Sequence, residues 1–269
     1  MPPILDNFSE RALIGMVHVG ALPGTPRAAA RIDELAEAAA AEARVLAEAG
    51  FDAIIVENMH DAPYVHGDAL GPEIVAGMTR AAHAVTNAVS VPVGVQILSG
   101  GNAHALAVCS ATGASFIRCE NFVFSHVADE GLLDRAEAGP LLRYRRSIGA
   151  EHIKVFCDIK KKHASHAITA DVSLAEAAHA AAFFGADGVI VTGSATGAPT
   201  SPSDVAEVRS ATKLPVLVGS GVTPDDAAKL LEHADALIVG SWIKREGHWS
   251  NPVDPGRAAK LIRAARASG

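Results

Sequence analysis

Short apolar runs alternate with Ala-rich segments from one end of the chain to the other, and this alternation constrains the fold more than any other feature. The apolar runs are typical of buried parallel strands, and the Ala-rich segments are typical of helices that cover them. We expect strands at Ala12–Val19, Ala53–Asn58, Pro92–Leu98, Phe116–Asn121, His152–Ile159, Gly188–Thr192, Pro215–Gly219 and Ala236–Gly240. We expect helices at Arg31–Ala49, Pro72–Val89, Ala103–Thr112, Gly139–Ile148, Ser173–Phe184, Ser203–Ala211, Pro224–His233 and Pro255–Ala267. Such alternation favours an α/β protein with a parallel sheet.

The number of units separates two α/β architectures. Eight strand–helix units with none left over fit a single-domain (β/α)8 TIM barrel over residues 1–269, although a doubly wound sheet could use the same elements. The first strand leads into His18–Gly24, which lacks the G-x-G-x-x-G pattern of a Rossmann fold. Three helix-to-strand joints end in Asp52, Asp187 or Asp235, where we expect the Asp to cap the local turn. This recurrence favours one regular domain over two unrelated ones.

The composition argues against several classes of protein. Hydrophobic residues make up 49% of the 269 residues but aromatic residues only 4%, so the core must rest on Ala, Val, Ile and Leu. A net charge of −7 argues against a surface built for nucleic acid. Cys109, Cys119 and Cys157 have no metal-type or paired spacing and fit reduced thiols. We find neither a leader pattern nor an apolar run of about twenty residues, so we expect a cytoplasmic protein without a transmembrane segment.

Two glycine–serine turns follow the last two expected strands. Backbone N–H groups at such turns can surround a phosphate, and glycine lets the chain approach an anion closely. In α/β barrels the turns after strands seven and eight form the usual phosphate site. The small residues after the sixth strand suit a third side of that site. The residues that we expect to bind phosphate are Gly193, Gly219, Ser220, Gly221, Gly240 and Ser241.

Polar side chains close most of the expected strands, and in a barrel such positions face the active site. We expect acid/base catalysis from Asp158, Glu57 and Glu120. We expect substrate contacts from His18, Asn58, Gln96, Arg118, Asn121, Lys160 and Thr192. Because side chains alternate along a strand, Glu57 and Asn58 cannot both face inward, nor can Glu120 and Asn121. The competing interpretation is a buried ion-pair belt or ordinary solvation of strand ends.

Two loops hold further reactive groups. The histidines and Asp of the loop after strand two, and the histidines of the loop after strand five, suggest a metal-dependent hydrolase that would use His60, Asp61, His163 or His166. His163 and His166 could hold a divalent ion together with Asp158, but no zinc-type signature surrounds them, and we predict no cofactor.

The sequence also contains lysines that bear on a Schiff-base mechanism. Lys160, Lys161 and Lys162 are adjacent, a pattern typical of a solvated face, although beside a phosphate pocket they would attract anions. The expected sixth strand has no lysine of the kind that class I aldolases use, and Lys154 would serve only if it were buried and neutral.

With these residues in place, the chain resembles the BtpA/SgcQ family over nearly its whole length. The stretches that carry the resemblance are Ile14–Pro26, Val56–Met59, Arg118–Asn121, Val155–His163, Val191–Gly193 and Val218–Thr223. The resemblance implies a phosphate-binding barrel of the type found in tryptophan and histidine biosynthesis. It also implies two quite different roles, since one cyanobacterial branch is named for photosystem I biogenesis, at the periphery of the thylakoid membrane, and another sits with sugar-uptake genes.

The residues therefore favour an enzyme that acts on a small phosphorylated sugar-like metabolite, as an isomerase or lyase. One alternative is a non-catalytic assembly or stability factor for photosystem I or another membrane complex, which predicts a large exposed apolar patch. The other is the metal-dependent hydrolase. As partners we expect the small phosphorylated substrate, no nucleic acid, and further copies of the chain, because barrels of this type often form homo-oligomers.

Overall fold

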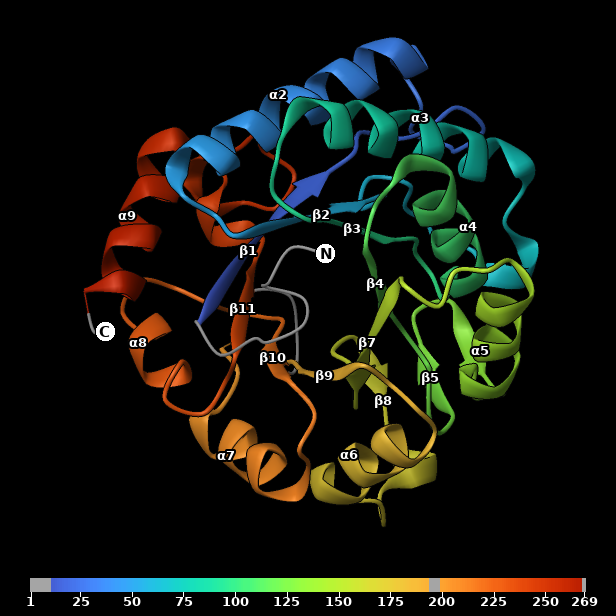
Figure 1. Cartoon of the computed structure of the whole chain (residues 1–269). Helices are drawn as coiled ribbons and strands as arrows, with labels where there is room; N and C mark the ends of the chain where they lie inside the picture. Colours follow the sequence, from blue (N-terminus) through green and yellow to red (C-terminus); the bar gives the residue numbers. More distant parts are fainter. Residues whose placement is uncertain (1–10, 194–198, 268–269) are drawn as a thin grey trace.

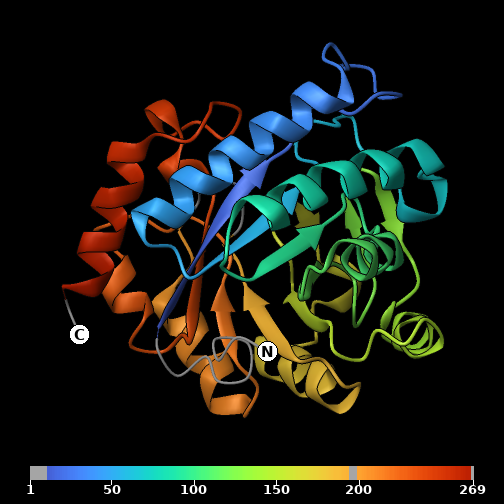
Figure 2. The same ribbon diagram turned by 45° about the horizontal axis from the view of Figure 1, so that its top comes forward.

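The computed structural model describes residues 11–193 and 199–267, and within them the parallel strands close into a barrel surrounded by helices (Figure 1). The barrel strands are β1 (Ala12–His18), β2 (Ala53–Glu57), β3 (Val93–Gln96), β4 (Phe116–Cys119), β7 (Lys154–Ile159), β9 (Gly188–Val191), β10 (Val216–Val218) and β11 (Ala236–Val239). Their order around the barrel is the order of the sequence, and β11 pairs with β1 to close it. The strands point toward one end of the barrel (Figure 2), and this end is the barrel mouth. The single-domain TIM barrel is confirmed.

The helices of the described residues follow the expected pattern. They are α2 (Ile32–Ala49), α3 (Pro72–Ala88), α4 (Asn102–Thr112), α5 (Ala138–Ser147), α6 (Leu174–Phe183), α7 (Pro202–Ala211), α8 (Ala227–Leu230) and α9 (Pro255–Arg266). The largest difference is α8, which is much shorter than the expected Pro224–His233. Tight turns replace both of its ends: Thr223 Oγ1 donates to Asp226 at 2.8 Å, and the N–H of His233 bonds back to Leu230. No helix in these ranges is long and apolar enough to cross a membrane.

The repeated aspartates at the helix-to-strand joints have a different partner from the one expected. Each carboxylate accepts a hydrogen bond from the backbone N–H near the start of the preceding barrel strand, instead of capping its own turn. The pairs are Asp52 with Leu13 (2.7 Å), Asp187 with Val155 (2.9 Å) and Asp235 with Val216 (2.8 Å). An arginine also contacts each of these carboxylates. The repeat therefore ties adjacent strands together at the closed end of the barrel.

Two phenylalanines fill the barrel interior below the mouth. The rings of Phe116 and Phe156 lie 5.6 Å apart and are fully buried. Glycines on the neighbouring strands make room for them, since a Cβ at Gly94 would lie 2.2 Å from the Phe116 ring and one at Gly188 would lie 2.7 Å from Phe156. With aliphatic side chains from the other strands, the rings seal the barrel, so any ligand site must lie above them.

A small antiparallel sheet covers one side of the mouth, and the sequence did not predict it. It consists of β5 (His126–Ala128), β6 (Gly131–Leu133) and β8 (Ala164–Ser165). The first two strands form a hairpin after β4, and the third comes from the loop after β7. The sheet therefore joins two loops that are well separated in the sequence and brings both to the same edge of the mouth.

Candidate active site

A cavity of about 370 Å³ opens at the carboxyl ends of the barrel strands. Its volume falls within the range of about 300–1,000 Å³ that is typical of small-molecule sites. It brings together most of the residues expected from the sequence, namely His18, Glu57, Gln96, Arg118, Glu120, Asp158, Gly219, Ser220, Gly221, Gly240 and Ser241. Because these residues come from seven of the eight barrel strands or the turns after them, they meet only in the closed barrel.

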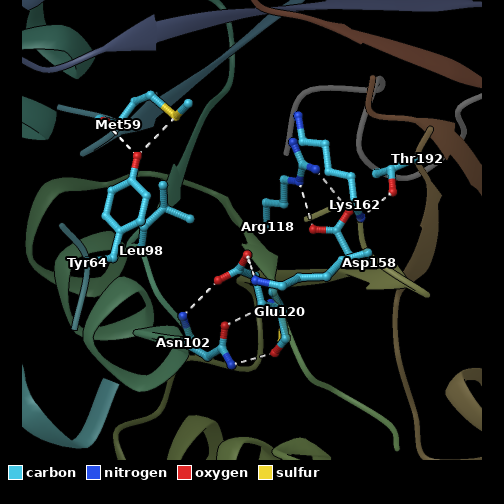
Figure 3. A network of polar contacts seen from close by, with 12 residues as sticks. Met59, Tyr64, Leu98, Asn102, Arg118, Glu120, Asp158, Lys162 and Thr192 are labelled. Atoms are coloured by element: carbon cyan, nitrogen blue, oxygen red, sulfur yellow. Dashed lines mark hydrogen bonds and ion pairs between the residues drawn. The ribbon is translucent and has the colours of Figure 1, made fainter. Parts of the chain in front are cut away.

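Arg118 and Asp158 form a buried, bidentate ion pair on one wall of the cavity (Figure 3). Arg118 Nε donates to one carboxylate oxygen at 3.0 Å and Nη2 to the other at 2.9 Å. The guanidinium lies close to Gly219, where a Cβ would come within 3.1 Å of Nη2. The glycine of the first turn therefore makes room for the arginine. Since both oxygens of Asp158 are engaged, the pair presents the guanidinium as a fixed positive charge.

Glu120 is held as a carboxylate by several donors. Lys161 Nζ lies 2.9 Å from one oxygen, and the N–H of Gly100 donates to the other at 2.8 Å. The side-chain amide of Asn102 donates to the backbone carbonyl oxygen of Glu120 and accepts from its backbone N–H (Figure 3). Burial alone would raise the pKa of Glu120, but Lys161 and the Gly100 N–H outweigh it, so the pKa lies below its usual value. Glu120 is thus a stable negative charge.

Glu57 has the opposite character. Burial raises the pKa of this carboxyl from 4.5 to about 7, and the nearby charges of Arg118 and Lys162 only partly counteract the effect. The imidazole of His18 lies beside it, with Nε2 3.4 Å from Glu57 Oε2. His18 Nδ1 lies 2.8 Å from the carbonyl oxygen of Trp249, which can only accept, so Nδ1 carries the proton and Nε2 is an acceptor. Burial also lowers the pKa of His18 well below its usual value, so the imidazole is neutral.

Lys162 extends into the same cavity from the loop after β7. Its backbone N–H donates to Thr192 Oγ1 at 2.9 Å, which fixes the start of the side chain at the mouth (Figure 3). Burial, followed by the charge of Arg118, lowers the pKa of the Lys162 amine below its usual value. Thr192 itself does not line the cavity, so its position supports a role in holding the loop, not in contacting substrate.

The two glycine–serine turns form the wall beside β10 and β11. Gly221 has φ +66°, a left-handed conformation that glycine adopts without strain. Thr200 Oγ1 donates to the carbonyl oxygen of Ser220 at 3.0 Å, which fixes that turn. Gly240 and Ser241 follow β11 directly and line the same cavity. The turns therefore line the same cavity as Lys161 and Lys162 of the loop after β7.

Four other expected residues also lie outside the cavity lining. The amide of Asn58 donates to Asp61 at 2.8 Å and accepts from the N–H of Leu98 at 2.7 Å, so it joins two loops behind the site. Asn121 and Lys160 line a separate cavity of about 20 Å³, which is large enough only for water. Gly193 does not line the main cavity and leads into residues 194–198, outside the described ranges.

The groups named for a metal site are dispersed. Asp61 accepts from the N–H of Leu22 at 2.8 Å as well as from Asn58, and the ring of His60 packs against Trp249. His166 bonds to the carbonyl oxygen of Lys161, whereas His163 lines the main cavity. Within residues 11–193 and 199–267, no group of three His, Cys, Asp or Glu side chains is placed to hold a metal ion. The side-chain geometry therefore gives the hydrolase alternative no support.

Several cavity residues were not identified from the sequence. They are Met59, Tyr64, Asp129, Glu130, Lys161, Lys162, Thr223, Trp242, Gly247 and Trp249, together with apolar side chains of the wall. They come mainly from the loops after β2 and β7, from the turn between β5 and β6, and from the segment between β11 and α9. That segment is anchored by Lys244, which is 1% exposed and lies 2.7 Å from Glu42 of α2. The available signal in the sequence was the long stretch between the second turn and the last expected helix, which is unusual for a connection that only returns the chain to a helix.

Comparison with solved structures gives the fold of the chain. The (S)-3-O-geranylgeranylglyceryl phosphate synthase of Thermoplasma acidophilum, in complex with sn-glycerol-1-phosphate, matches with a TM-score of 0.62 and 16% identity, over 98% of this chain and 97% of that one. The N-(5'-phosphoribosyl)anthranilate isomerase of Pyrococcus furiosus matches with a TM-score of 0.57 and 13% identity, over 96% and 100% of the two chains. At these identities the likeness shows a shared barrel.

Sequence comparison gives the family. An uncharacterized mitochondrial protein of Caenorhabditis elegans is 46% identical over 96% of this chain and 94% of its own length. The photosystem I biogenesis protein BtpA of Synechocystis is 35% identical over 95% of this chain and 88% of its own. The model of the BtpA family matches residues 9–267. Since the match covers the whole barrel and every residue of the cavity, the chain belongs to the BtpA family.

Proposed function

We propose that this protein is an enzyme that acts on a small phosphorylated sugar-like metabolite by acid/base catalysis. The observation that carries the proposal is the composition of one cavity: a carboxyl group with a pKa of about 7, Glu57, lies in the same space as two glycine–serine turns. A group that titrates near neutral pH can both give and accept a proton. The turns supply backbone N–H groups for a phosphate at the position where α/β barrels commonly bind one.

The three carboxylates take different roles in this proposal. Glu57 exchanges protons with the substrate because its pKa of about 7 lies near neutral pH, whereas the pKa of Glu120 lies below its usual value. Asp158 positions Arg118, since both of its oxygens are already bonded to the guanidinium. Glu120 balances the charge of Lys161.

An isomerase or lyase is the reaction class that this set supports best. Proton removal beside a carbonyl group places negative charge on the carbonyl oxygen, and a fixed guanidinium such as Arg118 stabilises that charge without reorganisation. Gln96 supplies a second contact: its Oε1 is buried at the cavity wall and has no hydrogen-bond partner among the described residues. A buried acceptor of this kind suits a substrate hydroxyl.

Assays of the purified protein against a panel of phosphorylated sugars, with their dephosphorylated forms as matched controls, test the proposal. We expect turnover of a phosphorylated member only. Glu57→Gln should abolish turnover, because the amide cannot exchange the proton, and Asp158→Asn should lower it by releasing Arg118. Full activity in Glu57→Gln would remove the proposed acid/base group, and full activity in Asp158→Asn would remove Asp158 from the mechanism.

The assembly-factor alternative has one observation in its favour. Phe183 and Phe184, at the end of α6, are 86% and 51% exposed and contact each other. A relative is also named as a photosystem I biogenesis protein. This alternative predicts that Glu57→Gln fully rescues a deletion strain, whereas Phe183→Ser does not; the enzyme predicts the reverse. The homo-oligomer and the cytoplasmic location stay predictions, and the name of the worm relative places that protein in mitochondria.

A further inference from the structure

Three adjacent lysines follow β7, and the structure gives each of them a different environment. Lys160 directs its amine to the carbonyl oxygen of Thr169 at 3.4 Å, away from the main cavity. Lys161 is paired with Glu120 at 2.9 Å. Lys162 lines the main cavity, and its amine makes no hydrogen bond or ion pair with any residue in the described ranges. Lys162 is therefore the one lysine of the three whose amine faces the ligand space without a protein partner there.

The surroundings of Lys162 favour an amine that reacts. A lysine is a nucleophile only when its amine is neutral, and desolvation or a neighbouring cation produces that state. Both conditions hold here, because the side chain is partly buried and the fixed charge of Arg118 lies nearby (Figure 3). The amine of Lys161 is not held neutral in this way. Its carboxylate partner, Glu120, outweighs the effect of burial, so the pKa of the Lys161 amine is raised.

The geometry points to a covalent role: we propose that Lys162 forms an imine with a carbonyl group of the substrate. This inference deepens the proposed function and rests on it, because the turns at Gly219–Gly221 and Gly240–Ser241 would hold the phosphate of the same molecule. It assigns the substrate to a narrower class, the phosphorylated aldehydes and ketones.

The amine of Lys162 and the carboxyl group of Glu57 are sufficient for imine formation and for the proton transfer that follows. The neutral amine of Lys162 attacks the carbonyl carbon, and the carbinolamine that forms loses its hydroxyl as water after Glu57 donates a proton. The product is a protonated imine and an ionised Glu57. The carboxylate then removes a proton from the neighbouring carbon, and the electron pair of that C–H bond moves toward the imine nitrogen. Reprotonation and hydrolysis with one water return the amine and release the carbonyl product.

Pyridoxal 5′-phosphate is a suitable probe because it is a phosphorylated aldehyde whose imines absorb visible light. The full-length protein is incubated with the probe, reduced with borohydride to convert the imine into a stable amine, and mapped by peptide mass spectrometry. We expect the label on Lys162, with little on Lys160 or Lys161. Inorganic phosphate should compete with labelling. The three lysines lie in one peptide, so they serve as controls for each other without any mutation.

Variants of the three lysines test whether the label depends on the Lys162 amine. Lys162→Arg keeps the charge but cannot form an imine, and labelling should fall by about tenfold or more. Lys160→Arg and Lys161→Arg should retain the label on Lys162. Labelling that is equal at all three lysines, or unchanged in Lys162→Arg, would overturn the inference. The melting temperature is also measured with and without inorganic phosphate, which distinguishes the two proposals. If phosphate raises the melting temperature but Lys162 is not labelled, only the imine proposal is wrong. If phosphate has no effect and Lys162 is not labelled, the proposed phosphate site is wrong as well.

Discussion

Replacement of Glu57 by Gln should make the protein more stable at pH 8 while abolishing turnover. Folding raises the pKa of this carboxyl from 4.5 to about 7. A carboxyl whose pKa is raised by folding destabilises the fold as the pH rises through that interval, because the unfolded chain releases the proton first. At about 1.4 kcal/mol per pH unit, the loss is about 3 kcal/mol once the pH exceeds 7. Because the Gln side chain has the same shape but carries no charge, the variant does not undergo this loss of stability.

The assay is thermal unfolding of wild type and Glu57→Gln at pH 5 and pH 8. Relative to wild type, the melting temperature of the variant should be about 5–10 °C higher at pH 8 than it is at pH 5. This follows because 1 kcal/mol of stability corresponds to about 2–4 °C for large domains. Glu120→Gln is the matched control with the opposite sign. It leaves the buried Lys161 ammonium without its carboxylate and should cost about 3 kcal/mol at pH 8. A Glu57→Gln variant that loses stability at pH 8 as Glu120→Gln does would refute the reasoning.

Two further predictions concern the scaffold. Glu42→Ala removes the carboxylate that pairs with the buried Lys244, and chemical denaturation should show a loss of about 3 kcal/mol; no loss would mean that this pair does not anchor the segment that contains Trp249. Gly94→Ala places a Cβ 2.2 Å from the Phe116 ring, so the free energy of unfolding should fall by about 1–3 kcal/mol, and an unchanged value would contradict the tight packing of the barrel interior.

The barrel and most of the cavity could be predicted because both depend on local patterns. Alternation along parallel strands puts Glu57 and Arg118 on the inner face, and the glycine–serine turns follow from the strand ends. The same rule also separates Glu57 from Asn58, which faces the loops behind the site. Such predictions hold as long as the chain remains in a strand.

The alternation rule fails where a strand ends. Alternation would put Lys160 on the same face as Asp158, but β7 ends at Ile159 and Lys160 has φ +46°, which redirects the chain. The amine that enters the cavity is instead that of Lys162. Nothing in the run of three lysines distinguishes them, because the difference depends on long-range partners in Glu120, Arg118 and Thr192.

The antiparallel sheet at the mouth was unpredictable for a related reason. Its strands contain only two or three residues each, too few for a recognisable alternation, and its pairing joins loops about forty residues apart. The hairpin turn nevertheless places Asp129 and Glu130 against the cavity. Residues of this kind can be found only once the fold has brought the two loops together.

A crystal structure of the protein soaked in phosphate would locate one end of the proposed substrate. We expect a single tetrahedral anion against the backbone of Gly219–Gly221 and Gly240–Ser241, inside the cavity that Glu57 and Lys162 also line. An anion bound only elsewhere, or a cavity that stays free of anion at saturating phosphate, would contradict this expectation.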